Sequence, residues 1–200
     1  MAQRERAAGR EHPKKPRLTA RDWADAALTA IREGGGLTSV AIEPLATRLA
    51  TTKGSFYWHF ANREALVEAA LARWVETNTD EIIKAVESER DAEARLRKLL
   101  TEVTKPTGTD PLELSLLAST DHPQVAAALQ QVTDRRIAYI ATLFTDLGFP
   151  EPEAAQRALM AYSFYLGHAQ LAHAVPSALP SREEFPGYLE GAVGALLGRG

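Results

Sequence analysis

Apolar side chains recur along most of this chain with the spacing of an α-helix, and no segment alternates as a strand would. In the first such segment they fall at positions i, i+3, i+4 and i+7: Ala24, Ala27, Leu28 and Ile31. Thr19 with Asp22 three residues later has the pattern of a capping box, and Gly34-Gly35-Gly36 follows the last apolar position. The sequence therefore predicts an amphipathic helix that starts after the capping box and ends at the glycines.

The same criteria predict further helices along the rest of the chain. Their expected ranges are 42–49, 52–60, 62–89, about 96–103, a short one from 111, 123–147, 151–174, and a last one that ends at 197. The start of the last helix is ambiguous, because Ser181 and Glu184 resemble a capping box while Pro186 would break a helix begun so early. We expect an all-α fold of about nine helices. The helix 62–89 would be about 40 Å long, enough to join two domains rigidly.

Composition narrows the class of protein. The 200 residues are 45% hydrophobic and 24% charged, and no apolar run approaches the roughly 20 residues that cross a bilayer. We therefore expect a cytoplasmic protein that does not interact with membranes. The chain has no cysteine, and His168 and His173 are five residues apart, so they do not share a helix face as a metal-binding pair would. The sequence indicates no catalytic residues, no metal site and no cofactor.

The two parts of the chain carry opposite charge. Residues 1–64 contain 11 Lys and Arg against 7 Asp and Glu, whereas the remaining residues contain 12 against 19. Residues 1–17 also have no helical period and mix Gly, Pro and charge, as a flexible basic arm does. A basic end on an acidic body favours contact of the first part with a polyanion, although a basic tail can also serve only to keep itself solvated.

Three short helices at the basic end are what a helix-turn-helix DNA-binding domain needs. Within them, residues 45–60 read LATRLATTKGSFYWHF and residues 62–66 read NREAL. This stretch resembles the DNA-binding signature of the TetR family of bacterial transcriptional regulators, and the resemblance is close over about residues 18–75. It implies a homodimer with an N-terminal DNA-binding domain and a larger C-terminal domain that binds a small inducer and then releases the operator. We expect an arm at 1–17, a DNA-binding domain at 18–64 and a ligand-binding and dimerisation domain at 65–200.

The recognition helix supplies the candidate DNA contacts. Thr52 can cap this helix, and Gly54 lets its backbone approach the groove closely. The side chains expected to face the groove are Lys53, Ser55 and Trp58. Tyr57 and His59 are phosphate donors by the resemblance, and Arg48 on the preceding helix is a lesser candidate.

Other interpretations of these residues stay open. Lys53 could be an ordinary solvated lysine, and Trp58 could belong to the core. Phe56 and Phe60 are expected to pack inward. Ala50 stands where the family often has glycine, which puts the shape of the turn in doubt, and Ala41 stands where a Ser or Thr usually caps the second helix.

Aromatic residues gather in the C-terminal half and can either line a cavity or form ordinary core. We name as candidate ligand-binding residues Trp74, Tyr139, Tyr162, Tyr165 and His168. Small residues such as Ala154, Ala158, Gly191 and Gly194 favour close helix packing in a four-helix dimer interface, as the resemblance also implies.

The sequence thus predicts a ligand-responsive regulator, a repressor in our interpretation, that binds a pseudo-palindromic double-stranded DNA operator as a homodimer. The expected effector is apolar or aromatic and neutral or cationic, because the body has no cationic cluster for a phosphorylated one. The alternative is an all-α small-molecule-binding protein or enzyme whose helix-turn-helix is vestigial.

Overall fold

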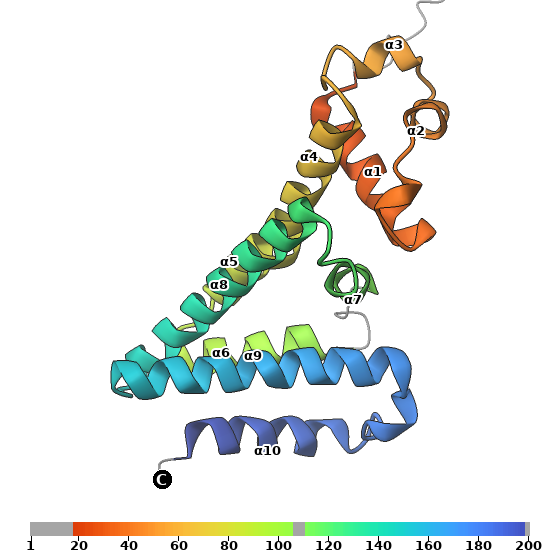
Figure 1. The fold of residues 1–200 in the computed structure, drawn as a ribbon. Helices are drawn as coiled ribbons and strands as arrows, with labels where there is room; N and C mark the ends of the chain where they lie inside the picture. The colour runs from red at the N-terminus through yellow and green to blue at the C-terminus, as the bar shows by residue number, and fades with distance from the viewer. Residues whose placement is uncertain (1–17, 106–110, 199–200) are drawn as a thin grey trace, which may run out of the picture.

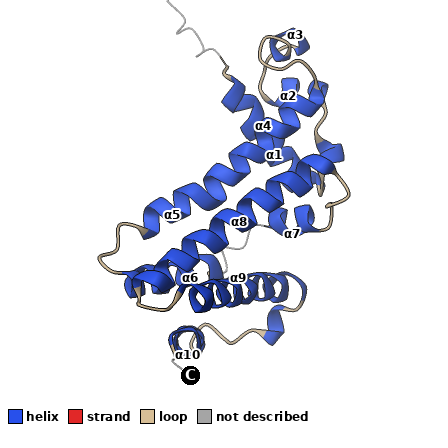
Figure 2. Ribbon diagram, turned by 60° about the vertical axis from the view of Figure 1, so that its left-hand side comes forward, coloured by secondary structure: helices blue, strands red, loops and turns tan. Residues whose placement is uncertain are grey.

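The computed structural model describes residues 18–105 and 111–198, and the regular structure within these ranges is helical (Figures 1 and 2). The elements are α1 (Ala20–Gly34), α2 (Ile42–Arg48), α3 (Lys53–Phe56), α4 (Arg63–Val75), α5 (Glu81–Val86), α6 (Ala92–Thr104), α7 (Pro111–Leu117), α8 (Pro123–Asp146), α9 (Glu151–Ala174) and α10 (Phe185–Leu197). A π-helical turn, Glu76–Asp80, joins α4 to α5 and is called the π turn below. With these three taken as one continuous helix, the described residues form nine α-helices, and the expected all-α fold is confirmed. The predicted arm at 1–17 lies outside the described residues.

Helix α1 has the ends that its sequence predicts. The Thr19 amide donates to the Asp22 carboxylate at 2.7 Å, and the Asp22 amide donates to the Thr19 hydroxyl at 3.3 Å, which completes the capping box. Gly35 ends the helix in the left-handed conformation, with φ of 73°. The apolar face of α1 is buried, so this helix is part of the hydrophobic core at the N-terminal end of the molecule.

The turn between α2 and α3 contains a residue in a strained conformation. Ala50 adopts φ of +50°, and no other described residue except glycine has positive φ. The Ala50 amide donates to the Thr47 carbonyl at 3.0 Å, and the Thr51 amide donates to the Ala46 carbonyl at 2.9 Å. These two bonds form a Schellman motif, which requires a left-handed residue at this position. The turn therefore keeps the shape that glycine normally provides, although alanine occupies it.

The recognition helix is shorter than predicted. Helix α3 ends at Phe56 rather than at residue 60, and the chain continues as turns in which the His59 and Phe60 amides donate to the Phe56 carbonyl at 2.9 and 3.0 Å. Thr52 occupies the N-cap position with an extended backbone, but its side chain makes no capping hydrogen bond. The expected capping role of Thr52 is therefore wrong for this structure. Within the first turn of α3, the Ser55 amide donates to the Thr52 carbonyl at 3.0 Å.

The predicted single helix 62–89 begins as expected, with the Ala65 amide donating to the Asn62 side chain at 2.9 Å, but the π turn interrupts it. The Thr77 hydroxyl donates to the Arg73 carbonyl at 2.9 Å, and the Asn78 side-chain amide donates to the Trp74 carbonyl at 3.2 Å. Side chains that bond back to carbonyls in this way compete with the regular backbone hydrogen bonds. This competition explains why the helix widens at residues 76–80.

The helices form an elongated molecule with two hydrophobic cores (Figure 1). Helices α1 to α3 lie at one end, α4, α5 and α8 run from there as a stalk, and α6, α9 and α10 are layered at the other end. The first core contains buried residues of α1 to α4 together with Leu112 and Leu116 of α7 and Val125 and Val132 of α8. The second core lies among α5, α6, α8, α9 and α10. Helix α8 thus contributes packed side chains to both cores.

The start of α10 resolves the ambiguity in the sequence. The Ser181 amide and hydroxyl both donate to the Glu184 carboxylate, at 3.0 and 2.8 Å, so the bonds of a capping box are present. They close a turn at 182–184, and the helix itself begins at Phe185 with Pro186 in its first turn. Proline is tolerated there because the amide that it lacks would have no helical partner.

Candidate functional site

The surface around α3 exposes aromatic side chains at one end of the molecule. We call Lys53, Ser55, Tyr57, Trp58 and His59, together with Arg48 of α2, the α3 face. Trp58 is 81% exposed and Tyr57 is 55% exposed, whereas the neighbouring Phe56 is fully buried in the first core. Lys53 is also exposed, and Ser55 and His59 are half-buried. The aromatic run therefore divides into an inward anchor, Phe56, and two outward side chains.

Both cations of the α3 face are held by carboxylates. Lys53 Nζ lies 2.5 Å from a Glu43 carboxylate oxygen, and Arg48 Nη2 lies 2.5 Å from Glu33. The hydrogen bond from Lys53 lowers the pKa of Glu43, and the same bond raises the pKa of Lys53. All four side chains are largely exposed, and exposed ion pairs are weak because water screens them. These pairs can therefore open when a stronger anion approaches.

The packing around residue 54 leaves room for a larger side chain than that of glycine. A Cβ atom at Gly54 would meet only the Thr52 hydroxyl, at 3.6 Å, which is an ordinary contact. Glycine inside a helix normally costs about 1 kcal/mol relative to alanine. The packing within the protein therefore does not require glycine at this position.

Arg63 was not assigned a role from the sequence, and the structure gives it one. From the first turn of α4, its Nε donates to the Val40 carbonyl at 2.8 Å, and its Nη2 donates to the Leu37 carbonyl. These bonds fix the loop before α2 to the start of α4. This guanidinium therefore adds hydrogen bonds to the apolar packing that orients α2 and α3 relative to α4.

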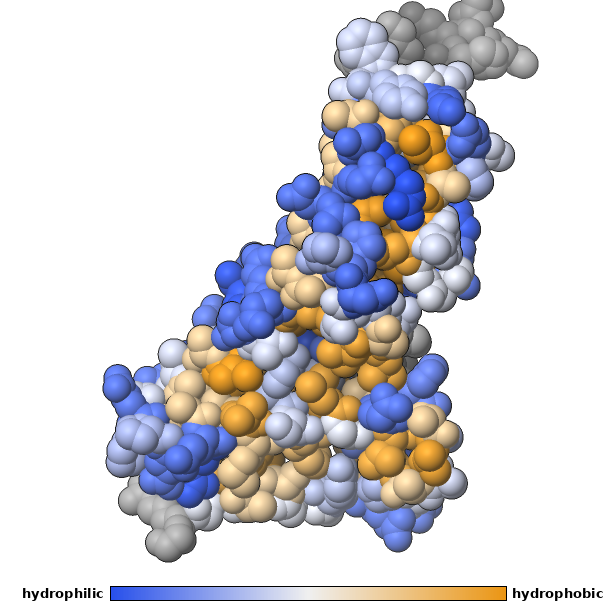
Figure 3. Space-filling view, viewed as in Figure 1, coloured by the Kyte–Doolittle hydropathy of each residue, from blue (hydrophilic) through white to orange (hydrophobic). Residues whose placement is uncertain are grey.

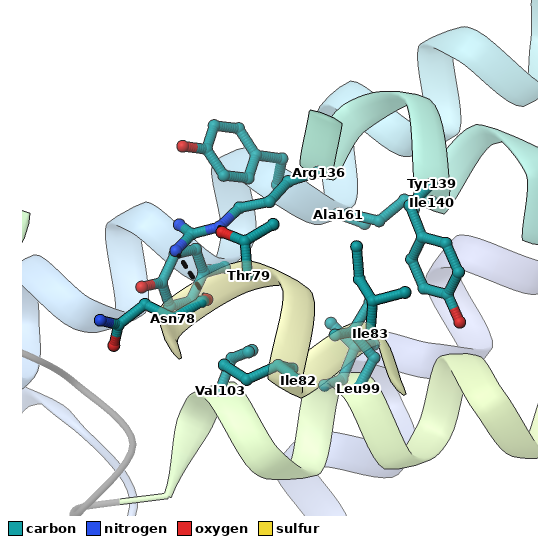
Figure 4. A pocket seen from close by; sticks show the side chains of 13 residues that line it. Asn78, Thr79, Ile82, Ile83, Leu99, Val103, Arg136, Tyr139, Ile140 and Ala161 are labelled. Carbon is teal, nitrogen blue, oxygen red and sulfur yellow. Dashed lines mark hydrogen bonds between the residues drawn. The ribbon is translucent and has the colours of Figure 1, made fainter. Parts of the chain in front are cut away.

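A cavity lies in the body between the stalk and the layered helices (Figure 4). Its volume is about 50 Å³. The aliphatic part of its lining consists of Ile82, Ile83, Leu99, Leu100, Val103, Ile140 and Ala161. Tyr139, Tyr162 and Tyr165 complete the wall, so three of the five predicted ligand-binding residues lie together here.

One end of this cavity is polar, and of the residues at this end only Tyr165 is predicted from the sequence. Arg136 of α8 donates to the Glu113 carboxylate of α7 at 2.7 Å, to the Thr79 hydroxyl at 3.0 Å and to the Asn78 carbonyl at 3.1 Å. The Tyr165 hydroxyl donates to the other Glu113 oxygen at 2.8 Å. Burial raises the pKa of Tyr165, which keeps this hydroxyl protonated. We call Asn78, Thr79, Glu113, Arg136 and Tyr165 the polar cluster.

The other two predicted ligand-binding residues lie outside the cavity lining. Trp74 is fully buried in the first core, and its indole N–H has no hydrogen-bond partner in the structure. His168 is buried between α9 and α10, where its Nε2 lies 3.1 Å from the Thr104 carbonyl and its ring contacts Phe185 and Tyr188. Burial lowers the pKa of His168, which favours the neutral ring.

The outer side of α9 and α10 is apolar, and hydrophobic residues reach the surface over this part of the molecule (Figure 3). A groove between the two helices is lined by Met160, Phe164, Tyr188, Gly191, Ala192, Ala195 and Leu196, which we call the α9–α10 face. Met160 is 56% exposed and Leu159 beside it is 54% exposed. Ala154 and Ala158, in contrast, pack into the second core, so they serve packing within the chain rather than this outer face.

Two further properties limit the chemistry. Among residues 18–105 and 111–198, no three His, Asp or Glu side chains are grouped closely enough to hold a metal ion. None of the helices in these ranges has the length and apolar character to span a membrane.

Comparisons with known proteins agree with this arrangement. The family model described as bacterial regulatory proteins, tetR family, matches residues 25–70, which include α2, α3 and most of α1 and α4. A transcriptional regulator from Rhodococcus sp. Rha1 has a similar structure, with a TM-score of 0.69 at 19% identity over 90% of this chain and 94% of that one. Reduced NemR from E. coli gives a TM-score of 0.69 at 20% identity, over 88% and 95%.

The fatty acid degradation regulator FadR from Bacillus halodurans is also similar, with a TM-score of 0.61 at 16% identity over 95% of this chain and 97% of that one. No curated protein matches the chain. At these identities the solved structures establish the fold, while the family model covers the helix-turn-helix itself. Residues 25–70 thus match the model of the tetR family of bacterial regulatory proteins, and the chain shares the fold of solved transcriptional regulators.

Proposed function

We propose that this protein is a transcriptional repressor that binds a pseudo-palindromic DNA operator as a homodimer and leaves it when a small molecule enters the cavity. In this proposal, residues 18–64 bind DNA and residues 65–200 bind the effector and the second subunit. The observation that carries it is the α3 face, where Tyr57 and Trp58 are exposed beside a fully buried Phe56. Tyr and Trp are enriched at binding interfaces, because each combines a large apolar ring with a polar group.

The chemistry of the α3 face suits duplex DNA. Lys53 can donate to guanine acceptors, Ser55 can pair with any base, and Trp58 offers an apolar surface to thymine methyl groups or sugars. Tyr57, His59 and Arg48 can donate to phosphates on either side. The exposed ion pairs of Lys53 and Arg48 open at little cost, so phosphate can replace Glu43 and Glu33.

The α9–α10 face supports the second subunit. Helix α10 has one charged residue, Glu190, and only Val193 and Leu196 of its side chains are buried within the chain. A second copy related by a two-fold axis would cover both apolar helices and form a four-helix interface. The two α3 faces of such a dimer require half-sites about one helical turn, roughly 34–36 Å, or a multiple of it, apart.

Two connections support communication between the cavity and the α3 face. The helix formed by α4, the π turn and α5 begins beside the helix-turn-helix and ends at the cavity lining. Helix α7 places Leu112 and Leu116 in the first core while its Glu113 belongs to the polar cluster. An effector that favours one arrangement of these helices by about 1 to 3 kcal/mol would weaken operator binding about 5- to 150-fold.

Selection of duplexes from a random pool tests the proposal. We expect enrichment of a pseudo-palindrome and a steep fall of affinity with salt, because the protein displaces counterions from several phosphates. A salt dependence near zero, or a pool without enrichment, would rule out the repressor. The result would then favour the alternative of a small-molecule-binding protein with a vestigial helix-turn-helix.

A further inference from the structure

The polar cluster holds one buried cation and one buried anion that neutralise each other. The Arg136 side chain is 13% exposed and the Glu113 side chain is 4% exposed, and their charged atoms lie 2.7 Å apart. Burial by itself would lower the pKa of Arg136, but the Glu113 carboxylate, together with Tyr165 and Tyr162, outweighs it and the pKa is raised. Arg136 therefore stays charged with a carboxylate 2.7 Å away, and the cavity offers a ligand no unpaired cation.

An ionic ligand would leave one of these charges without a partner. A carboxylate that took Arg136 would leave Glu113 buried beside a second anion, with only the Tyr165 hydroxyl to donate to it. Glu113 does not itself line the cavity, so a cation would have to displace Arg136 to reach it, and Arg136 would then be the charge without a partner. Burying an unpaired charge costs several kcal/mol, and the aliphatic remainder of the lining cannot offset this.

A neutral oxygen can join the cluster without this cost. Besides Glu113, Arg136 donates to two uncharged acceptors of the π turn, the Thr79 hydroxyl and the Asn78 carbonyl. Figure 4 shows the guanidinium directed at these two residues, with Ile82 and Val103 along the adjoining wall. A ligand carbonyl or ether oxygen could accept in place of either one, and the pair of Arg136 with Glu113 would remain intact.

We propose that the cavity binds an uncharged, largely apolar molecule that carries one hydrogen-bond-accepting oxygen. Arg136 donates to that oxygen, and Glu113 is the residue that excludes carboxylates by occupying Arg136. This proposal rests on the proposed function in taking the cavity as the effector site. It narrows the sequence-based expectation, which allowed a cationic effector as well.

Four probes of nearly the same shape test the charge preference. Acetophenone is neutral with a carbonyl oxygen, ethylbenzene is neutral without one, benzoate is an anion and benzamidine is a cation. Their affinities are measured on the full-length protein without DNA, by titrations followed with ligand-observed NMR. We expect acetophenone to bind at least about 10-fold more tightly than each of the other three. Equal or tighter binding of either ion, or no binding of any probe, would overturn the proposal.

The variant Glu113→Gln tests the assigned role of Glu113. It keeps the size of the side chain but leaves Arg136 as a single buried cation, so benzoate should bind at least about 10-fold more tightly than to the wild type and should overtake acetophenone. Benzamidine should stay weak. Unchanged benzoate affinity in a folded variant would contradict the assignment.

The control variant is Glu93→Gln. Glu93 lies on α6, where it pairs with Arg97, is 49% exposed and does not line the cavity. This variant has the same change in net charge and should keep the wild-type order of the four probes. Circular dichroism checks the fold of each variant. If Glu113→Gln does not fold, the order of the four probe affinities on the wild-type protein tests the proposal by itself. DNA is absent from these titrations. Failure to find an operator would therefore contradict the proposed function but would leave the order of the four probe affinities unchanged.

Discussion

The α3 face and the polar cluster both contain an ion pair, but the two pairs differ in their surroundings. Lys53 and Glu43 are 51% and 65% exposed, whereas Arg136 and Glu113 are 13% and 4% exposed. Water screens the first pair, so its members can exchange partners freely. The second pair is shielded from water, and its members make three further hydrogen bonds, so Arg136 and Glu113 stay paired with each other. An exposed pair suits a surface that must accept many phosphates, and a buried pair suits a cavity that must select one kind of molecule.

The largest effect that we expect concerns the α9–α10 face, which belongs to neither site. Ala195 on α10 is exposed in this groove, and Ala195→Arg places a charge where the second subunit would pack. The variant should sediment as a monomer and lose about 10²- to 10⁴-fold in operator affinity, because each half-site is then bound singly. Gln131→Arg, on an exposed position of α8, is the control and should remain dimeric. A dimeric Ala195→Arg would place the interface elsewhere.

The buried pair can be distinguished from the exposed pair by stability. Arg136→Met leaves the Glu113 carboxylate buried without its cation, so we expect the free energy of unfolding to fall by about 3–5 kcal/mol in urea titrations. Lys53→Met, which removes the exposed cation, should leave stability almost unchanged. Arg136→Met combined with Glu113→Leu should recover most of the loss, because no buried charge then remains. Equal losses in both single variants would show that the two pairs do not differ as described.

Operator binding distinguishes base contacts from phosphate contacts on the α3 face. Lys53→Ala should lower affinity about 5- to 150-fold for the selected operator and relax the preference at one or two base pairs. Tyr57→Phe should weaken all duplexes to a similar extent, since a phosphate contact carries no sequence information. Both are measured by titration with the operator and with single-base-pair variants of it. A uniform loss for Lys53→Ala would mean that this lysine also contacts only phosphate.

The same contrast explains what the sequence could predict. The candidate DNA contacts lie within residues 48–59, so one continuous motif indicated them together. The polar cluster draws Asn78 and Thr79 from the π turn, Glu113 from α7, Arg136 from α8 and Tyr165 from α9, and no spacing along the chain relates these positions. Periodicity predicted most helices, but the widening at residues 76–80 depends on hydrogen bonds from Thr77, Asn78 and Arg136. Contacts between residues far apart in the sequence cannot be predicted from the local spacing of apolar residues.

The smallest effect that we expect concerns Ala50, whose strain is stored next to the α3 face. A left-handed conformation costs a residue with a side chain about 1–2 kcal/mol, and glycine avoids this cost but loses about 0.5–1 kcal/mol of conformational entropy on folding. Ala50→Gly should therefore stabilise the protein by about 0.5–1 kcal/mol, which corresponds to a rise in melting temperature of roughly 1–4 °C. Operator affinity should not change, because the Schellman hydrogen bonds of Ala50 and Thr51 are made by the backbone.

The matched control for this prediction is Ala72→Gly, at an exposed position of α4 where the backbone is helical. The same substitution there should destabilise the protein by about 0.5–1 kcal/mol, since glycine gains nothing from a helical conformation and still loses entropy. The two variants should thus differ in sign in a thermal unfolding experiment. If both lower the melting temperature, Ala50 does not adopt a left-handed conformation in solution, and the turn that orients α3 toward DNA must be built differently.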